Sequence, residues 1–237
     1  MTVYTAQFPY LWSYLTVVHG TSALLTGWIV QTMNVGFLIG SFSVGLLIKY
    51  TGHYKYFITG GACAYIGSLT LIMKYRQTTD KLWIIVLLQL YLGMSASFVS
   101  LPTQLAIQAS TTSYASIIAL YLIMHDIGGA AGSAIAGAIW TDQLPKKLQD
   151  HLPGQSSSEM QSIVKNMTMA IERWPRDSPE KLAINMAYSQ TVTLLVKIGL
   201  ALAAFLVPLS LCLKNLQLKQ VCRCMGVPGF KLLAQGR

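Results

Sequence analysis

The chain has 237 residues, of which 53% are hydrophobic and only 11% charged, and its mean hydropathy is +0.50. Soluble domains carry about 25% charged residues, so too few charges are present to cover a water-facing surface of this size. The net charge is +9, but the basic residues stand between and after apolar runs, without interleaved aromatics. This distribution argues against a nucleic-acid partner and indicates the lipid bilayer instead.

Six apolar segments follow in chain order, each bounded by charge, proline or a polar cluster: 6–19, 24–48, 56–73, 82–105, 115–140 and 191–213. A helix that spans a bilayer needs about 20 apolar residues. The first segment is short, as if the chain begins inside a helix. Barrel strands would alternate over about ten residues, and these runs are longer and do not alternate. The sequence therefore predicts an all-α, polytopic membrane protein with about six transmembrane helices.

The fifth connection, 141–190, is the long one, and it holds most of the acidic residues together with four prolines. We expect short helices and irregular loop there, packed at the outer membrane surface. The predicted division is a six-helix body over 1–218, which includes this loop, and a basic cytosolic tail over 219–237.

Orientation is predicted from the basic residues, which accumulate on cytosolic loops. Lys49 and Lys55 flank the second connection, and the segment 214–237 carries five basic residues and no acid. Both patterns favour cytosolic ends for the chain. The third connection disagrees, since three basic residues from Lys74 onward face one acid there. Asn166 begins an N-x-[ST] sequon in the predicted outer loop and is therefore a glycosylation candidate.

Small residues recur at four-residue spacing within three of the predicted helices. Such stripes let helix backbones approach closely in lipid. Two interpretations stay open, namely static packing and helices that rock against one another during transport. The candidate packing positions are Gly36, Gly40, Gly45, Gly128, Gly132 and Gly137, with Gly93 and Ser97 on the fourth helix.

Ionisable residues inside a membrane span are expensive and are functional candidates by default. His125 and Asp126 lie near the middle of the fifth predicted helix, and Tyr121 precedes His125 by one turn. A carboxyl beside an imidazole can load and release a proton, so Asp126 and His125 are proton-coupling candidates. The alternative is an aspartate that only fixes helix packing.

Gln104 and Gln108 follow Pro102 near the end of the fourth helix, one turn apart on one face. Their amides suit either a polar substrate or a neighbouring helix. The sequence contains no P-loop, G-x-S-x-G, H-E-x-x-H or C-x-x-C pattern, so we predict no enzyme, no cofactor and no metal site.

Several stretches resemble a known transporter superfamily. The segment 45–55, with Gly45, Lys49, Gly52 and Lys55, resembles the cytosolic loop motif of the major facilitator superfamily, where a tight turn and positive anchors join two spans. Further stretches resemble the seventh, tenth and eleventh core helices of fungal siderophore-iron transporters: 13–19, 102–109 and 119–145. The glycine-rich run that ends at Thr141 is the most specific.

The resemblance implies the C-terminal half of a proton-coupled carrier for ferric hydroxamate-type siderophores, which works by alternating access between two six-helix halves. It implies that an N-terminal half is missing. Tyr188 matches the position of a tyrosine implicated in siderophore contact, and Tyr14, Tyr121, Gln104 and Gln108 are further substrate-binding candidates. The family usually has asparagine at Asp126, so the proton role of Asp126 rests on the local argument alone.

Two alternatives remain beside this interpretation. One is a proton antiporter for glutathione or drugs, because the same fold hosts many substrates. The other is an inactive half-transporter that binds a partner. The plasma membrane and an endosomal or vacuolar membrane are both compatible with the sequence.

Overall fold

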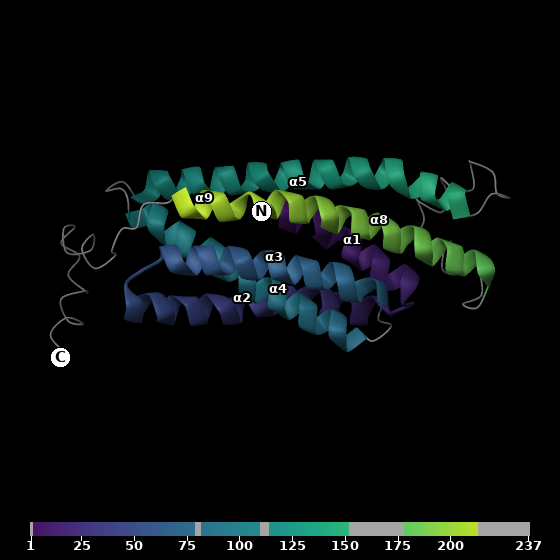
Figure 1. The fold of residues 1–237 in the computed structure, drawn as a ribbon, viewed down its shortest axis with the longest axis horizontal. Coiled ribbons are helices and arrows are strands. Elements are labelled where there is room, and N and C mark those ends of the chain that lie inside the picture. Colours follow the sequence, from purple (N-terminus) through teal and green to yellow (C-terminus); the bar gives the residue numbers. More distant parts are fainter. Residues whose placement is uncertain (1, 79–81, 110–113, 152–177, 213–237) are drawn as a thin grey trace.

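A computed structural model describes residues 2–78, 82–109, 114–151 and 178–212. The described chain is helical, which confirms the all-α prediction. Figure 1 shows the helices in chain order: α1 (Thr2–Val18), α2 (Ala23–Thr51), α3 (Lys55–Thr78), α4 (Leu82–Ala109), α5 (Tyr114–His151), α8 (Pro179–Ala204) and α9 (Leu206–Cys212).

Five helical segments of the described chain are long and apolar enough to cross a membrane: Ala23–Thr51, Lys55–Tyr75, Leu82–Gln108, Ala115–His151 and Glu180–Leu211. The last of these combines α8 and α9. Helix α1 has 17 residues, which is slightly short of the length that a bilayer requires. The prediction of a polytopic helical protein is therefore confirmed.

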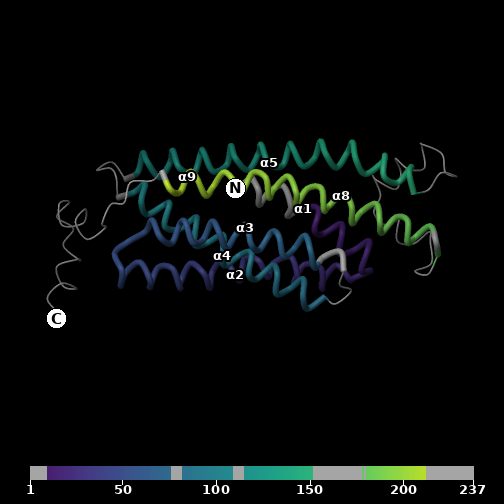
Figure 2. Tube along the Cα trace, viewed as in Figure 1, coloured from purple at the N-terminus to yellow at the C-terminus, as the bar shows by residue number. Residues whose placement is uncertain are grey.

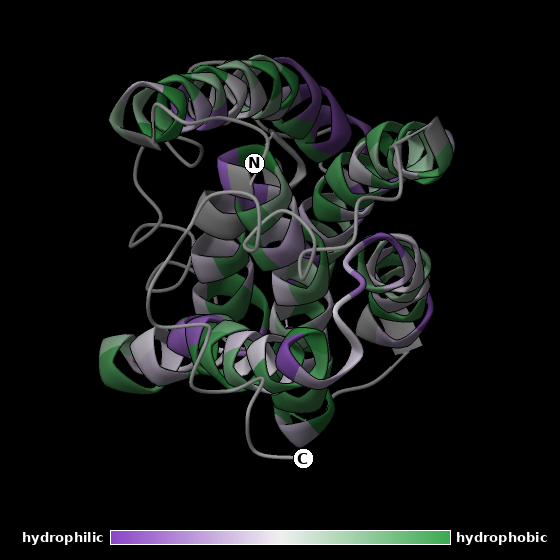
Figure 3. Ribbon diagram, turned by 90° about the vertical axis from the view of Figure 1, so that its left-hand side faces the viewer, coloured by the Kyte–Doolittle hydropathy of each residue, from purple (hydrophilic) through white to green (hydrophobic). Residues whose placement is uncertain are grey.

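The helices pack as two groups that lie side by side. Helix α2 packs most extensively against α4, which also contacts α3, whereas α1, α5 and α8 contact one another. Helix α3 joins the groups, because it also packs against α8 and α9. The trace in Figure 2 shows that successive long helices run in opposite directions along one axis. Seen from the end, hydrophobic residues follow the outward as well as the inward sides of the helix ribbons (Figure 3).

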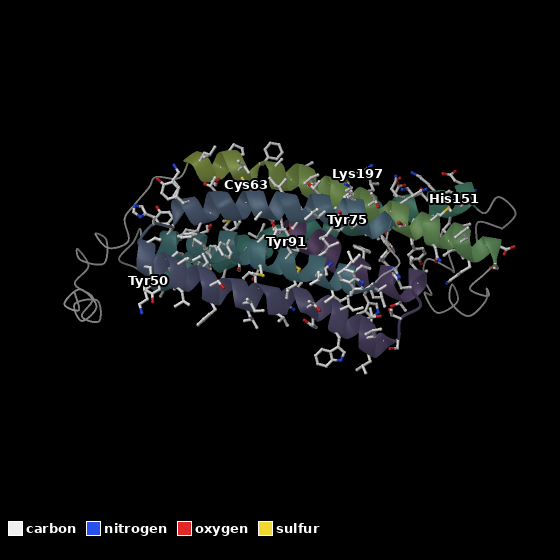
Figure 4. The ribbon with its side chains drawn as sticks, turned by 60° about the horizontal axis from the view of Figure 1, so that its bottom comes forward. Tyr50, Cys63, Tyr75, Tyr91, His151 and Lys197 are labelled. Carbon is white, nitrogen blue, oxygen red and sulfur yellow. The ribbon has the colours of Figure 1, made fainter. Side chains whose placement is uncertain are left out.

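A tight turn joins α2 to α3 and defines what we call the α2–α3 end of the bundle. Gly52 adopts a left-handed φ of 72°, which glycine reaches without steric cost. Its N–H donates to the Ile48 carbonyl at 2.8 Å, so this helix terminus is closed by a glycine cap. Helix α3 then begins at Lys55. Tyr50 marks this end in Figure 4, and His151 lies at the opposite one.

Three glycines bring the backbones of α2 and α4 into direct contact. A Cβ atom at Gly36 would collide with the carbonyl oxygen of Leu90, and one at Gly93 would collide with that of Met33. Gly40 faces the α4 backbone in the same way. No larger residue fits at this contact unless the helices separate.

Gly45 takes no part in the α2–α4 contact, so its predicted packing role stays a prediction. A Cβ atom there would meet no heavy atom within 4 Å in the described chain. The reason is register, because four-residue spacing from Gly36 and Gly40 leads to Val44, which is fully buried, and Gly45 points about 100° away. On α5, Gly132 is buried while Gly128 and Gly137 are half-buried.

The predicted loop 141–190 is shorter than expected, because helices occupy both of its ends. Helix α5 continues to His151 although Pro145 lies inside it. Leu144 and Leu148 are fully buried against the start of α8, and this burial offsets the hydrogen bond that Pro145 cannot donate. The segment 152–177, with the candidate Asn166, and the predicted tail lie outside the described residues, so the domain division stays a prediction.

We predict that Gly93→Ala destabilises the bundle, because its methyl group would overlap the α2 backbone. Overpacking of this kind costs about 1–3 kcal/mol, which would appear as a lower melting temperature in detergent. Gly45→Ala is the matched control, and it should leave the melting temperature equal or raise it slightly, since alanine is the better helix former. Equal destabilisation by both variants would contradict the described α2–α4 contact.

Candidate functional site

A polar contact joins α4 and α5 inside the apolar span. The hydroxyl oxygens of Ser100 and Tyr121 lie 3.4 Å apart, and the ring of His125 lies one turn further along α5, with 6.1 Å between the ring centroids of Tyr121 and His125. Tyr121 and His125 are both half-buried. The structure thus brings together two of the predicted site residues with a serine that the sequence analysis missed.

Asp126 points away from this contact. Its carboxylate Oδ1 lies 3.7 Å from the Nδ1 of His125, but its side chain is 83% exposed, against 33% for His125. The two predicted proton-coupling residues are therefore adjacent, with the imidazole partly buried near Tyr121 and the carboxylate turned out of the described chain.

The depth of Asp126 follows from the Ser100–Tyr121 contact. Because α4 and α5 run in opposite directions (Figure 2), the part of α5 near residue 126 lies approximately level with α4 near residue 95. That position is the middle of the apolar span Leu82–Gln108. The exposed carboxylate consequently lies at a depth where an aspartate facing lipid costs about 2.5–3.5 kcal/mol.

Helix α5 is the least covered of the apolar spans. In the 18-residue stretch of α5 with the highest hydropathy, 11% is buried, compared with 33–39% for the corresponding stretches of the other four spans. Two stripes of exposed residues can be traced along α5 at helical spacing. The large apolar stripe comprises Leu120, Met124, Ile127 and Ile135. The small stripe comprises Ala119, Asp126, Ala130 and Ser133 and ends at the half-buried Gly137, with the exposed Leu122 and Ile123 at its two edges.

The two stripes face different directions. At about 100° per residue, their centres lie about 130° apart around the helix axis. The small stripe ends beside α1, since a Cβ atom at Gly137 would lie 3.6 Å from the Tyr10 hydroxyl. Asp126 therefore lies on the small stripe, where Ala130 one turn later permits close helix contact, whereas the larger Leu122 stands one turn before it.

The two amide candidates lie at the α2–α3 end of the bundle. Gln104 and Gln108 follow the buried Pro102 on α4, and both are half-buried. Both lie closer to the end of α4 than Ser100 does. The amides are therefore on the same helix as the Ser100–Tyr121 contact, but at a different depth.

Two predicted substrate contacts are buried in the core. Tyr14 is 2% exposed, packs among apolar residues of α1, α2, α4 and α8, and meets His19 edge-on at 5.6 Å between ring centroids. Tyr188 is 1% exposed. In this arrangement neither ring is available to a solute.

Tyr188 belongs to an aromatic stack at the junction of α1, α5 and α8. Its ring meets Trp140 edge-on at a centroid distance of 5.6 Å, and Trp140 stacks on Tyr10 at 4.5 Å. Tyr188 also packs against Leu144 and Leu148. The stack fixes the position of α5 against α8, so the structure gives Tyr188 a packing role. No local pattern predicts this stack, because its members are 130 and 48 residues apart in the sequence.

The loop-motif residues occupy the α2–α3 end. Lys49 lies in the last turn of α2 and Gly52 caps it. The Lys55 ammonium donates to the Leu211 carbonyl at 2.8 Å, a long-range contact that the motif alone does not predict. Among the described residues, no three histidine, cysteine, aspartate or glutamate side chains group as metal ligands.

Comparisons with known proteins agree with this architecture. The family described as "Sugar (and other) transporter" matches residues 2–108. The siderophore iron transporter mirC of Emericella nidulans is 34% identical over 93% of this chain and 37% of its own length. The MFS siderochrome iron transporter C of Aspergillus fumigatus is 34% identical over 93% of the chain and 36% of its own length.

A more distant relative points the same way. The siderophore iron transporter 1 of Schizosaccharomyces pombe is 29% identical over 84% of this chain and 32% of its own length. No solved structure matches the chain. The chain spans little more than a third of the length of the curated relatives it matches.

The helices and these matches define a multi-pass membrane protein of the major facilitator type. The chain is similar to fungal siderophore-iron transporters of that superfamily over 93% of its length, and the predicted resemblance is confirmed. Which membrane holds the protein stays a prediction.

Proposed function

We propose that this chain is one half of a proton-coupled carrier that takes up ferric siderophore by alternating access. The observation that carries the proposal is the 34% identity to proteins named siderophore iron transporters over 93% of the chain, within only 37% of the relative's length. The same observation supports an N-terminal half that precedes these helices in the complete carrier.

The uncovered surface of α5 supports a second half. An aspartate at membrane depth normally faces a protein interior or a water-filled cavity, and Asp126 is 83% exposed in this chain alone. The small residues around Asp126 would let a helix of the missing half approach closely. We propose that this helix brings a hydrogen-bond donor to the Asp126 carboxylate.

Asp126 and His125 are the proposed proton-coupling groups. Their separation of 3.7 Å allows a proton to pass between the carboxylate and the imidazole through a small rotation of either side chain. Tyr121 links His125 to Ser100 on α4. We propose that a change of protonation at this pair alters the α4–α5 contact, which involves the same helix as the amide candidates Gln104 and Gln108.

The exposed face also supports a second candidate, in which the chain is an inactive half that binds a partner. Binding of a second half requires only the α5 surface, whereas transport also requires a complete substrate path. The uptake experiment separates these two functions.

We predict that the 237-residue chain alone does not take up iron. Uptake of a radioactive ferric hydroxamate siderophore would be measured in yeast that lacks siderophore carriers. A chimera in which this chain replaces its matching segment in the Aspergillus fumigatus transporter C should restore uptake, because the missing wall of the path is then present. The parent transporter is the positive control, and unlabelled ferric siderophore, glutathione and a drug mixture serve as competitors.

A chimera that reaches the membrane but carries no siderophore would overturn the transport proposal, and one that pulls down the other half without uptake would favour the inactive binding half. Uptake by the chain alone would contradict the proposal that a second half is needed.

We further predict that Asp126→Asn in the active chimera abolishes the acceleration of uptake by an inward proton gradient, because an amide cannot carry the proton. Substrate exchange without a gradient should continue. Asp142→Asn is the matched control, since Asp142 lies on the same helix, pairs with Lys146 at 2.6 Å and should leave the gradient dependence unchanged. An Asp126→Asn carrier that still responds fully to the gradient would exclude Asp126 from proton coupling.

A further inference from the structure

The last helix is kinked at Phe205. The N–H of Phe205 donates to the Leu202 carbonyl at 3.3 Å, which is a tighter turn than the α-helix. Pro208 lacks an N–H, and its ring would collide with the carbonyl of Ala204 in a straight helix. Phe205 itself keeps a helical backbone, and its carbonyl accepts from the N–H of Leu209 at 3.3 Å, so α9 meets α8 at a kink.

Polar contacts hold α9 against the start of α3. The Lys55 ammonium donates to the Leu211 carbonyl at 2.8 Å. The hydroxyl oxygens of Ser210 and Thr59 lie 3.2 Å apart, and Ser210 is buried. These contacts join residues more than 150 positions apart in the chain.

The Lys55 contact comes from another helix and reaches the last described turn of α9. Its donor is charged, and hydrogen bonds with a charged donor are stronger than those between neutral groups. The opposite face of α9 is open, since Phe205, Leu209 and Leu211 are 67%, 64% and 58% exposed. The hydrophobic contact of α9 with the bundle is limited to residues such as Leu206, which packs at the edge of the core cluster around Leu69.

The core of α8 does not depend on this contact. Val196 and Ala203 of α8 are buried in the cluster that α2, α3 and α4 share. Loss of the polar contacts would therefore release α9 while α8 stays packed.

We propose that α9 is a hinged latch, which pivots at Phe205 and is held closed against α3 by Lys55 at the α2–α3 end. Opening of the latch would expose the start of α3 and uncover Ser210 without unfolding the bundle. The latch is independent of the proposed transport function, because every contact that carries it lies within the described chain.

Hydrogen exchange of the full chain in lipid nanodiscs tests the latch. Lys55→Ala should speed amide exchange in α9 about tenfold or more, because a hydrogen bond to a charged group is lost, and exchange in α8 should be unchanged. Lys55→Arg should keep the slow exchange of α9, since a guanidinium also donates to a carbonyl. Lys49→Ala is the matched control, with a lysine of the same end removed and no change expected.

Two results would overturn the latch. Unchanged exchange in α9 of the Lys55→Ala protein would mean that Lys55 does not hold the segment. Equal acceleration in α8 and α9 would mean that Phe205 is not a pivot. The Lys55→Arg protein keeps the test decisive if Lys55→Ala fails to fold, because faster exchange in α9 with arginine present would contradict the carbonyl contact.

Discussion

Within hydrocarbon, no water is available to the backbone, so each N–H and C=O must find its partner inside the protein. This constraint explains why the described chain consists largely of long helices. At the end of α2 the backbone finds a partner through Gly52, whose N–H donates to the Ile48 carbonyl. In the last described turn of α9 the carbonyl of Leu211 accepts from the ammonium of Lys55, which comes from α3.

Because every helix satisfies its own backbone, the side chains between the helices determine which helices pair with one another. In lipid there is little hydrophobic force between two apolar helices, so close approach and polar contacts decide which pairs form. Gly36, Gly40 and Gly93 create such an approach between α2 and α4. The aromatic stack of Tyr10, Trp140 and Tyr188 performs the corresponding role between α1, α5 and α8. Helix α5 is held mainly through its second half, and its first half is left open.

The spans could be predicted from the sequence because an apolar run of 20 or more residues has few alternative explanations. Their ends could not. Pro145 and the charges around it indicate a loop, yet α5 continues because Leu144 and Leu148 are buried by a segment some 40 residues later. Gly45 also belongs to a repeat of small residues, but it lies on a side of α2 that no other described helix covers closely.

The sequence indicates which residues are candidates for the site, but it does not indicate which side of the bundle each of them faces. The pattern places His125 and Asp126 at membrane depth, as the structure does, but a helix with small residues on several faces does not reveal which side is covered. Tyr14 and Tyr188 are substrate-binding candidates in the sequence, and both are core residues in the described chain. Ser100 was missed because its contact with Tyr121 joins two helices, and no local signal marks it.

The central claim is that further helices cover the small stripe of α5 in the complete carrier. It is tested most directly by spin labels on single cysteines, Ala130→Cys on the small stripe and Met124→Cys on the large apolar stripe, with the native cysteines replaced by serine. Electron paramagnetic resonance would measure the accessibility of each label to oxygen dissolved in the bilayer. In the chain alone both labels should be accessible. In the chimera with the other half present, the label on Ala130→Cys should be protected and the label on Met124→Cys should stay accessible. Equal accessibility of the Ala130→Cys label in the chain alone and in the chimera would contradict the account.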